Sequence, residues 1–192
     1  MKRVTMIVAA VAFCTMTAAE ASAQANLALR GIGLKAGVVN PEDLSTTLGF
    51  GFVFDLGTVH PNVALESYAG YWQQTESEFG AEVAAKDFAF GGKAKYLFKT
   101  SNPTVQPYAG AGLGLHVLNA SVEVPPVMSG GSVIFPGMSA DDTEVKLGLD
   151  LGGGLRIDRG DQFAFIGEGW FSVVSDISHF SLMVGAVYMF GR

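Results

Sequence analysis

The chain has 192 residues, a formal net charge of −6, 16% charged residues and 25 glycines. This length fits one domain or two small ones, and after the N-terminal segment no apolar run reaches the ~18 residues that a membrane-spanning helix needs. The composition therefore excludes a helical membrane protein. Because charge is scarce, it also excludes a disordered chain, and the absence of Lys and Arg clusters excludes a nucleic-acid binder.

The N-terminal segment predicts a cleavable secretory signal peptide over residues 1–23. Lys2–Arg3 form a short positive region, 4–17 is mostly apolar, and Ala21–Ala23 is a small-x-small cleavage site. A short buried helix is the alternative interpretation. The only cysteine, Cys14, lies inside this segment, so the exported chain must be stabilised without disulfides.

The remainder, residues 24–192, is expected to form a single all-β domain, because its apolar residues alternate with period two. In the clearest segment, Leu48, Phe50 and Phe52 share one face while Gly49 and Gly51 share the other. Eight segments of this kind are expected, at about 27–39, 47–57, 63–72, 88–98, 105–118, 144–157, 162–174 and 180–190.

The connections alternate in length. The second, fourth and sixth, at 57–62, 100–104 and 158–161, are short and contain turn residues. The third and fifth, at 73–84 and 119–142, are predicted to be longer loops. Short turns on one side and longer loops on the other are typical of outer-membrane barrels. The fifth connection is unusually apolar, so it is expected either to extend two strands above the membrane or to fold over the mouth.

Alternation alone does not decide whether the apolar face points inward, as in a soluble barrel, or outward to lipid. Two features favour lipid outside: the polar faces carry many glycines, as a narrow eight-stranded interior requires, and aromatic residues gather near strand ends, as in interfacial girdles. These aromatics are Tyr71, Tyr96, Phe98, Phe163, Phe165, Tyr188 and Phe190.

The charges of the polar faces are a third such feature, because buried charges need partners. We expect them in the lumen of the barrel, as Lys35, Lys93, Lys95, Lys146 and Arg156 opposite Asp55, Glu66, Asp150 and Glu168. Solvated surface charges are the alternative. The expected fold is an eight-stranded antiparallel up-and-down transmembrane β-barrel, preceded by the signal peptide.

Two segments resemble those of a known family: residues 107–114, which read Pro-Tyr-Ala-Gly-Ala-Gly-Leu-Gly, and the last strand, which ends in Tyr188-Met189-Phe190. Together with the signal peptide, they make the chain resemble the small outer-membrane β-barrel proteins of Gram-negative bacteria, the OmpA-, OmpX- and OmpW-like porin-family barrels. The resemblance implies a monomeric, multi-pass protein of the bacterial outer membrane that contacts lipid and lipopolysaccharide. It also implies that the barrel assembly machinery reads the last strand, although here Phe190 is followed by Gly191-Arg192, whereas the family usually ends on the aromatic.

The three histidines are candidates for chemistry. His60 lies in a predicted turn, and His116 is expected to point into the lumen as an ordinary hydrogen-bonded side chain. His179 and Ser181 share one face and resemble the base and nucleophile of outer-membrane lipid A deacylases. Those enzymes have a downstream Glu, but no acidic residue follows Ser181.

No catalytic, cofactor-binding or metal-binding residue is expected. The glycines at 110–114 and 152–154 lack the Lys-Ser/Thr of a phosphate loop, and the acidic residues at 141–144 lack calcium-loop spacing. An eight-stranded interior is just wide enough to be filled by side chains, so the expected function is structural or a narrow passage for small solutes. A lipid-modifying enzyme and a soluble lipocalin-like ligand-binding barrel are the alternatives.

Overall fold

The computed structural model describes residues 26–190, apart from 79–80, 103, 131 and 176. The predicted signal peptide, its cleavage site and Cys14 lie outside the described residues, as do Gly191 and Arg192. The polypeptide that the structure describes contains no helix long and apolar enough to cross a membrane.

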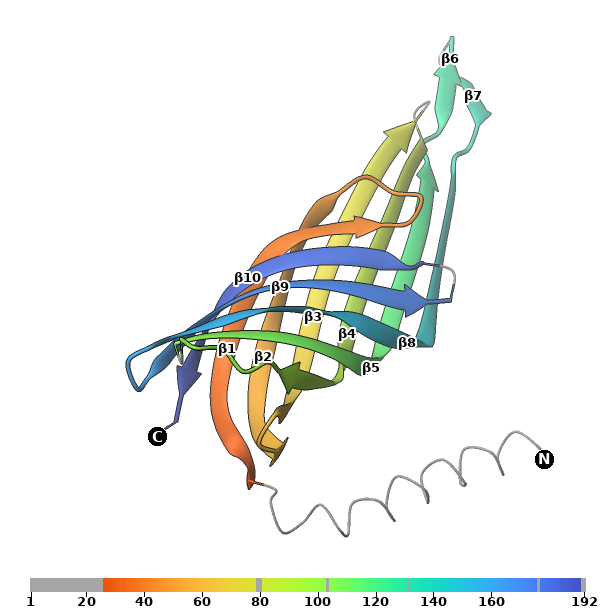
Figure 1. Ribbon diagram of the computed structural model, residues 1–192. Helices are drawn as coiled ribbons and strands as arrows, with labels where there is room; N and C mark the ends of the chain where they lie inside the picture. Colours follow the sequence, from red (N-terminus) through yellow and green to blue (C-terminus); the bar gives the residue numbers. More distant parts are fainter. Residues whose placement is uncertain (1–25, 79–80, 103, 131, 176, 191–192) are drawn as a thin grey trace, which may run out of the picture.

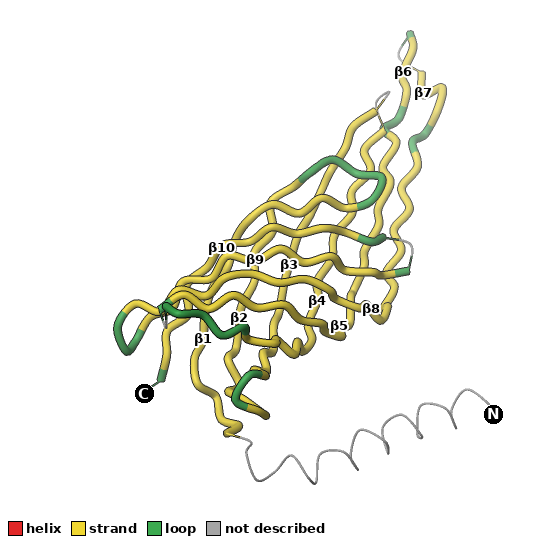
Figure 2. Tube along the Cα trace, in the orientation of Figure 1, coloured by secondary structure: helices red, strands yellow, loops and turns green. Residues whose placement is uncertain are grey.

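Eight antiparallel strands form a closed barrel, in the spatial order β1-β10-β9-β8-β5-β4-β3-β2 (Figure 1). The prediction of an eight-stranded up-and-down barrel is confirmed, and loops are confined to the ends of the strands (Figure 2). The barrel strands are β1 (Asn26–Pro41), β2 (Thr47–His60), β3 (Val63–Glu78), β4 (Ala81–Leu97), β5 (Val105–Val124), β8 (Met138–Arg159), β9 (Phe163–Val174) and β10 (His179–Met189). Two short strands, β6 (Val127–Ser129) and β7 (Ser132–Phe135), form a separate hairpin between β5 and β8.

Rows of large apolar side chains point outward along every barrel strand. In β2, Phe50 and Phe52 are 58% and 52% exposed, whereas the alternating Gly49, Gly51 and Val53 are buried. A soluble barrel would bury the phenylalanines, because exposed apolar surface of this extent is not tolerated in water. The lipocalin-like alternative is therefore wrong.

Aromatic side chains surround the barrel at both ends of its apolar belt. At the end where β1 begins and β10 ends, Tyr188 contacts both Phe163 and Phe190 edge-on, and Tyr96 contacts Phe98. The predicted girdle residues are all exposed on the outer surface, Tyr71 at the opposite end of the belt. Such rings are suited to the boundary between hydrocarbon and water.

The third and fifth connections are shorter than the sequence predicts. β3 continues to Glu78 and β4 resumes at Ala81, while β5 runs to Val124 and β8 begins at Met138. Of the two interpretations of the fifth connection, extension of the strands is confirmed. Figure 1 shows β3, β4, β5 and β8 continuing beyond the point where the other four strands end. The prediction of a loop at 73–84 is wrong, because strand pairing persists there.

Candidate functional site

The interior of the barrel holds large polar side chains because glycines on the neighbouring strands leave room for them. A Cβ on Gly112 would lie 2.6 Å from Cγ of Lys93, and a Cβ on Gly51 would lie 3.0 Å from Cε of Lys35. A Cβ at 2.6 Å is closer than real side chains approach and one at 3.0 Å is unusually tight, so a side chain at either position would push the neighbouring lysine from its place. The glycine-rich inner faces therefore position the lumen charges.

Glu168 of β9 lies at the centre of one layer of this interior. Lys35 Nζ donates to its Oε1 at 2.7 Å, and Lys95 Nζ donates to its Oε2 at 3.2 Å. The Tyr108 hydroxyl also donates to Oε2, at 2.7 Å. Lys95 in addition forms an ion pair with Glu66. Side chains from five strands thus meet in a single ion-paired layer across the barrel.

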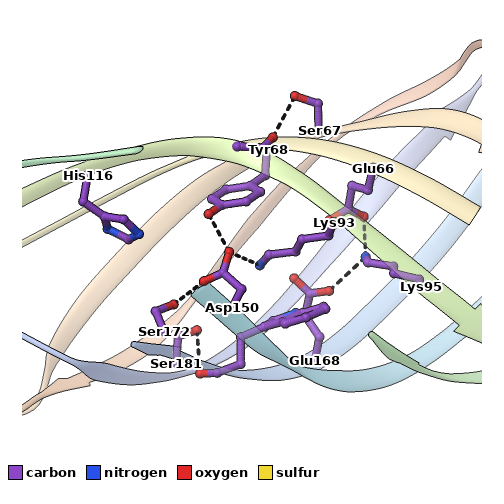
Figure 3. Close-up of polar contacts among 12 residues, drawn as sticks. Glu66, Ser67, Tyr68, Lys93, Lys95, His116, Asp150, Glu168, Ser172 and Ser181 are labelled. Atoms are coloured by element: carbon purple, nitrogen blue, oxygen red, sulfur yellow. Dashed lines mark hydrogen bonds and ion pairs between the residues drawn. The ribbon is translucent and has the colours of Figure 1, made fainter. Parts of the chain in front are cut away.

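Asp150 of β8 is the centre of a second layer (Figure 3). The hydroxyls of Ser172 and Tyr68 donate to its two oxygens at 2.5 and 2.6 Å. Lys93 Nζ lies 3.9 Å from Oδ2. The same ammonium group lies 3.9 Å from the centroid of the Trp170 ring and 4.3 Å from that of Tyr68. Aromatic faces attract a cation, so they supplement the single carboxylate partner.

A third group of charged side chains lies nearer the end of the barrel where β1 begins. Arg156 Nη1 donates to Asp55 Oδ2 and Arg156 Nε donates to Asp158 Oδ1, both at 2.8 Å. Arg156 and Asp55 keep some exposure because they face an open cavity of about 280 Å³. This pair is therefore less desolvated than the two layers above it.

Near the opposite end, His116 Nδ1 lies 2.8 Å from Asp87 Oδ2, and both side chains are buried. The ring of His179 packs edge-on against His116 and against Trp72, with ring centroids 5.8 Å apart in each case. These side chains line a second cavity of about 50 Å³. His116 thus points into the lumen and is hydrogen-bonded there, as the sequence predicts.

The remaining residues with predicted roles are placed less centrally. Lys146 lies at the rim, where it pairs with the exposed Glu144 at 2.5 Å. Ser181 is buried and its hydroxyl donates to the Trp170 carbonyl at 3.4 Å. His60 is exposed as the last residue of β2, directly before the turn to β3 and not within it. The structure thus brings most of the predicted lumen charges together inside the barrel but leaves Lys146 outside the two layers.

The two cavities share no lining residue. The ion-paired layers lie between them, and an apolar cluster packs on either side of these layers. Val53, Ala164, Ile166, Val187 and Met189 form one cluster. Val39, Trp72 and Met183 form the other, and Ala85 of β4 packs against it together with Leu44 and Ile177 from the loops at the mouth. The lumen is therefore occluded at several levels.

Several interior partners were not found from the sequence. Tyr68 and Trp170 have no predicted role, although they fall on the same alternating faces as Glu66 and Glu168. Tyr108 enters the sequence analysis only through the 107–114 motif, although it shares a face with His116. Asp87 lies just before the predicted strand 88–98, so its alternation with Lys93 is not part of that prediction. Among the described residues, no group of three or more His, Cys, Asp or Glu side chains is placed to hold a metal ion.

Comparison with known proteins agrees with this architecture. The family model described as "Outer membrane protein beta-barrel domain" matches residues 6–190. No curated protein matches the sequence.

Solved structures with the same fold include Neisserial surface protein A, at 17% identity and a TM-score of 0.62, covering 86% of this chain and 100% of that one. The attachment invasion locus protein Ail of Yersinia pestis, in complex with the heparin analogue sucrose octasulfate, has 19% identity and a TM-score of 0.54, covering 83% and 95%. The N-terminal β-barrel domain of Pseudomonas aeruginosa OprF has 13% identity and a TM-score of 0.53, covering 84% and 98%.

Proposed function

The chain belongs to the family of outer membrane protein β-barrel domains, and from this premise we propose that it is a closed structural barrel that anchors a β-sheet at the outer surface of the cell. It is an integral protein of the bacterial outer membrane. The observation that carries the proposal is the occlusion of the lumen by the layers centred on Glu168 and Asp150. Because desolvated ion pairs are held by several partners at once, they do not part readily to let a solute through.

A narrow passage for small solutes is the weaker alternative. It would require both ion-paired layers to rearrange together. The cavity of about 280 Å³ beside Arg156 is separated from the other cavity by these layers. We therefore propose that its role is to hydrate one mouth of the barrel and not to conduct.

We propose that the protein is not an enzyme. His179 Nδ1 has no hydrogen-bond partner among the described residues, so no carboxylate orients it as a general base. The Ser181 hydroxyl is directed to a backbone carbonyl inside the barrel. A lipid substrate would approach from outside, where neither side chain is accessible.

The proposed partners follow from the outer surface. The apolar belt and its aromatic girdles suit membrane lipid and lipopolysaccharide. The alternating outward residues Phe180, Leu182, Val184 and Tyr188 of β10 suit recognition of the last strand by the barrel assembly machinery. The closed barrel leaves no unpaired strand edge within the bilayer, which supports a monomer.

Planar-bilayer recording of the refolded mature chain tests the proposal. The wild-type barrel should give no steady conductance above background. The quadruple variant Lys35→Ala/Glu168→Ala/Lys93→Ala/Asp150→Ala removes ion pairs from both layers without changing net charge, and it should give measurable current. Lys35→Ala/Glu168→Ala alone should stay closed, because the layer around Asp150 remains. The control variant Lys146→Ala/Glu144→Ala removes a pair at the rim and should stay closed. Stable wild-type channels of the same conductance as the quadruple variant would contradict the proposal.

A further inference from the structure

The two faces of the sheet exchange their chemical character where four strands leave the bilayer. Across β3, β4, β5 and β8 the last apolar outward row is Tyr71, Phe88, Val117 and Val145. The next outward row is Gln73, Lys86, Asn119 and Thr143. This change within one row marks the membrane surface, because the outward side chains beyond it face water.

Beyond this surface the opposite face of the same strands becomes apolar. Val83 pairs with Val122 and Ala85 pairs with Ala120, all on the face that continues the lumen. We call Val83, Ala85, Leu118, Ala120 and Val122 the inner face; Ala85 and Leu118 are half-buried at its base, where Ala85 packs against the Trp72 cluster, while Val83, Ala120 and Val122 are exposed. Val83 and Val122 remain 41% and 37% exposed although no lipid reaches them. An antiparallel sheet with one apolar face normally packs that face against another element.

Carboxylates border the inner face on both sides. Glu76 of β3 is directly opposite Val83, while Asp142 and Glu144 of β8 are directly opposite Ala120 and Leu118. The reverse side of the sheet is also acidic, because Glu82 and Glu123 are paired there and both are exposed. A second copy of this chain would bring like charges together, which opposes self-association through this sheet.

We propose that the inner face binds a basic amphipathic helix of a partner polypeptide, and this inference rests on the proposed function of the barrel as an anchor for the outer sheet. The four strands are about 14 Å across at roughly 4.8 Å per strand spacing. A helix is about 10–12 Å in diameter, so a single helix fits between the acidic borders. Its apolar side would cover Val83 and Val122, while Lys or Arg side chains on its flanks would reach Glu76 and Asp142. Glu76 also accepts a hydrogen bond from Ser45 N at 2.7 Å, and Glu144 beside Asp142 is already paired with Lys146.

The test measures binding of a synthetic 18-residue Leu/Lys amphipathic peptide to the full mature chain in zwitterionic nanodiscs, with empty nanodiscs subtracting lipid binding. A Leu/Glu peptide of the same pattern is the charge control. The Leu/Lys peptide should bind with 1:1 stoichiometry, and its affinity should fall as salt rises. Equal binding of the Leu/Glu peptide, or no binding of either, would overturn the proposal.

Matched variants locate the site. Val83→Ser/Val122→Ser should weaken binding at least tenfold, and so should Glu76→Gln/Asp142→Asn/Glu144→Gln. The control Glu82→Gln/Glu123→Gln lies on the reverse face of the same strands and should bind as the wild type does. An unaffected Val83→Ser/Val122→Ser variant, or equal loss in the control, would overturn the proposal.

Two further measurements keep the outcomes separate. Heat-modifiable gel mobility verifies that each variant is a folded barrel, since all substituted residues lie outside the bilayer. Conductance of the wild type is measured independently of the peptide. A closed barrel that ignores the peptide refutes only this inference, whereas an open barrel refutes the proposed function.

Discussion

Glu168 illustrates how a charged side chain is maintained inside a barrel that is surrounded by hydrocarbon. Its side chain is fully buried, yet it accepts hydrogen bonds from Lys35, Lys95 and Tyr108. A buried charge is costly unless it is paired and hydrogen-bonded. Removing the Glu168 carboxylate should lower the free energy of unfolding by more than the ion pairs contribute to it, because the ammonium groups of Lys35 and Lys95 would both lose a partner while buried.

The variant Glu168→Gln tests this at the level of one residue. We expect the free energy of unfolding to fall by about 3–5 kcal/mol, the range for breaking a buried ion pair. Equilibrium urea unfolding in phospholipid vesicles, followed by tryptophan fluorescence, measures the change. The signal is favourable because Trp170 lies beside Lys93 in the interior.

Glu144→Gln is the matched control, since Glu144 pairs with Lys146 at the exposed rim. Exposed ion pairs contribute at most about 1 kcal/mol, so the free energy of unfolding should change by less than that. If both variants lose the same stability, Glu168 is not held in a desolvated network.

At the scale of one element, β8 passes through two environments. Leu151 is 48% exposed toward lipid, whereas Thr143 lies in the first polar row beyond the membrane surface. The alternation of the strand is continuous between them. The same kind of substitution should therefore have different consequences at the two positions.

Arginine substitution measures this difference. Leu151→Arg should destabilise the barrel by about 2–4 kcal/mol, whereas Thr143→Arg should cost only about 0–1 kcal/mol. The midpoint of urea unfolding in vesicles gives both values. Equal effects would show that the membrane surface does not lie between these two positions.

Much of the barrel was predictable from the period-two pattern, because each strand places large apolar residues opposite glycines and charges. Residues 81–84 and 119–122 fall in the predicted loops 73–84 and 119–142, since their apolar side chains lie on the face that points into the lumen elsewhere in the same strand. The pattern inverts there instead of ending. At the site, Lys35 and Glu168 were recognisable as inward charges, but Tyr68 and Tyr108 were missed. Aromatic residues also occur on the lipid face, so residue type alone does not assign them.

On the scale of the whole molecule, the outer sheet, which is the part of β3, β4, β5 and β8 beyond the membrane surface, is separable from the barrel. There β5 pairs with β4 and β8, so most contacts of the hairpin formed by β5 and β8 lie within the outer sheet itself. Ser121 and Asp141 are directly opposite each other. A two-residue turn can therefore close the two strands at this point without a change of register.

Replacement of residues 122–140 by Asn-Gly should leave the barrel folded. Heat-modifiable mobility and the urea midpoint of the shortened protein should stay close to those of the wild type. Binding of the Leu/Lys peptide should be lost, since Val122 is removed. A shortened chain that no longer refolds would show that the hairpin is needed to complete the barrel.

The ring closes between segments from opposite ends of the polypeptide. Lys35 and Glu168 are 133 residues apart, and β1 lies directly beside β10. Bringing such remote segments together costs chain entropy before any contact offsets it. Until β1 pairs with β10, the sheet has two edges whose backbone N–H and C=O groups are unpaired, and hydrocarbon does not tolerate such groups. A partly closed sheet therefore cannot enter the bilayer, so membrane insertion and pairing of β1 with β10 occur as one concerted event.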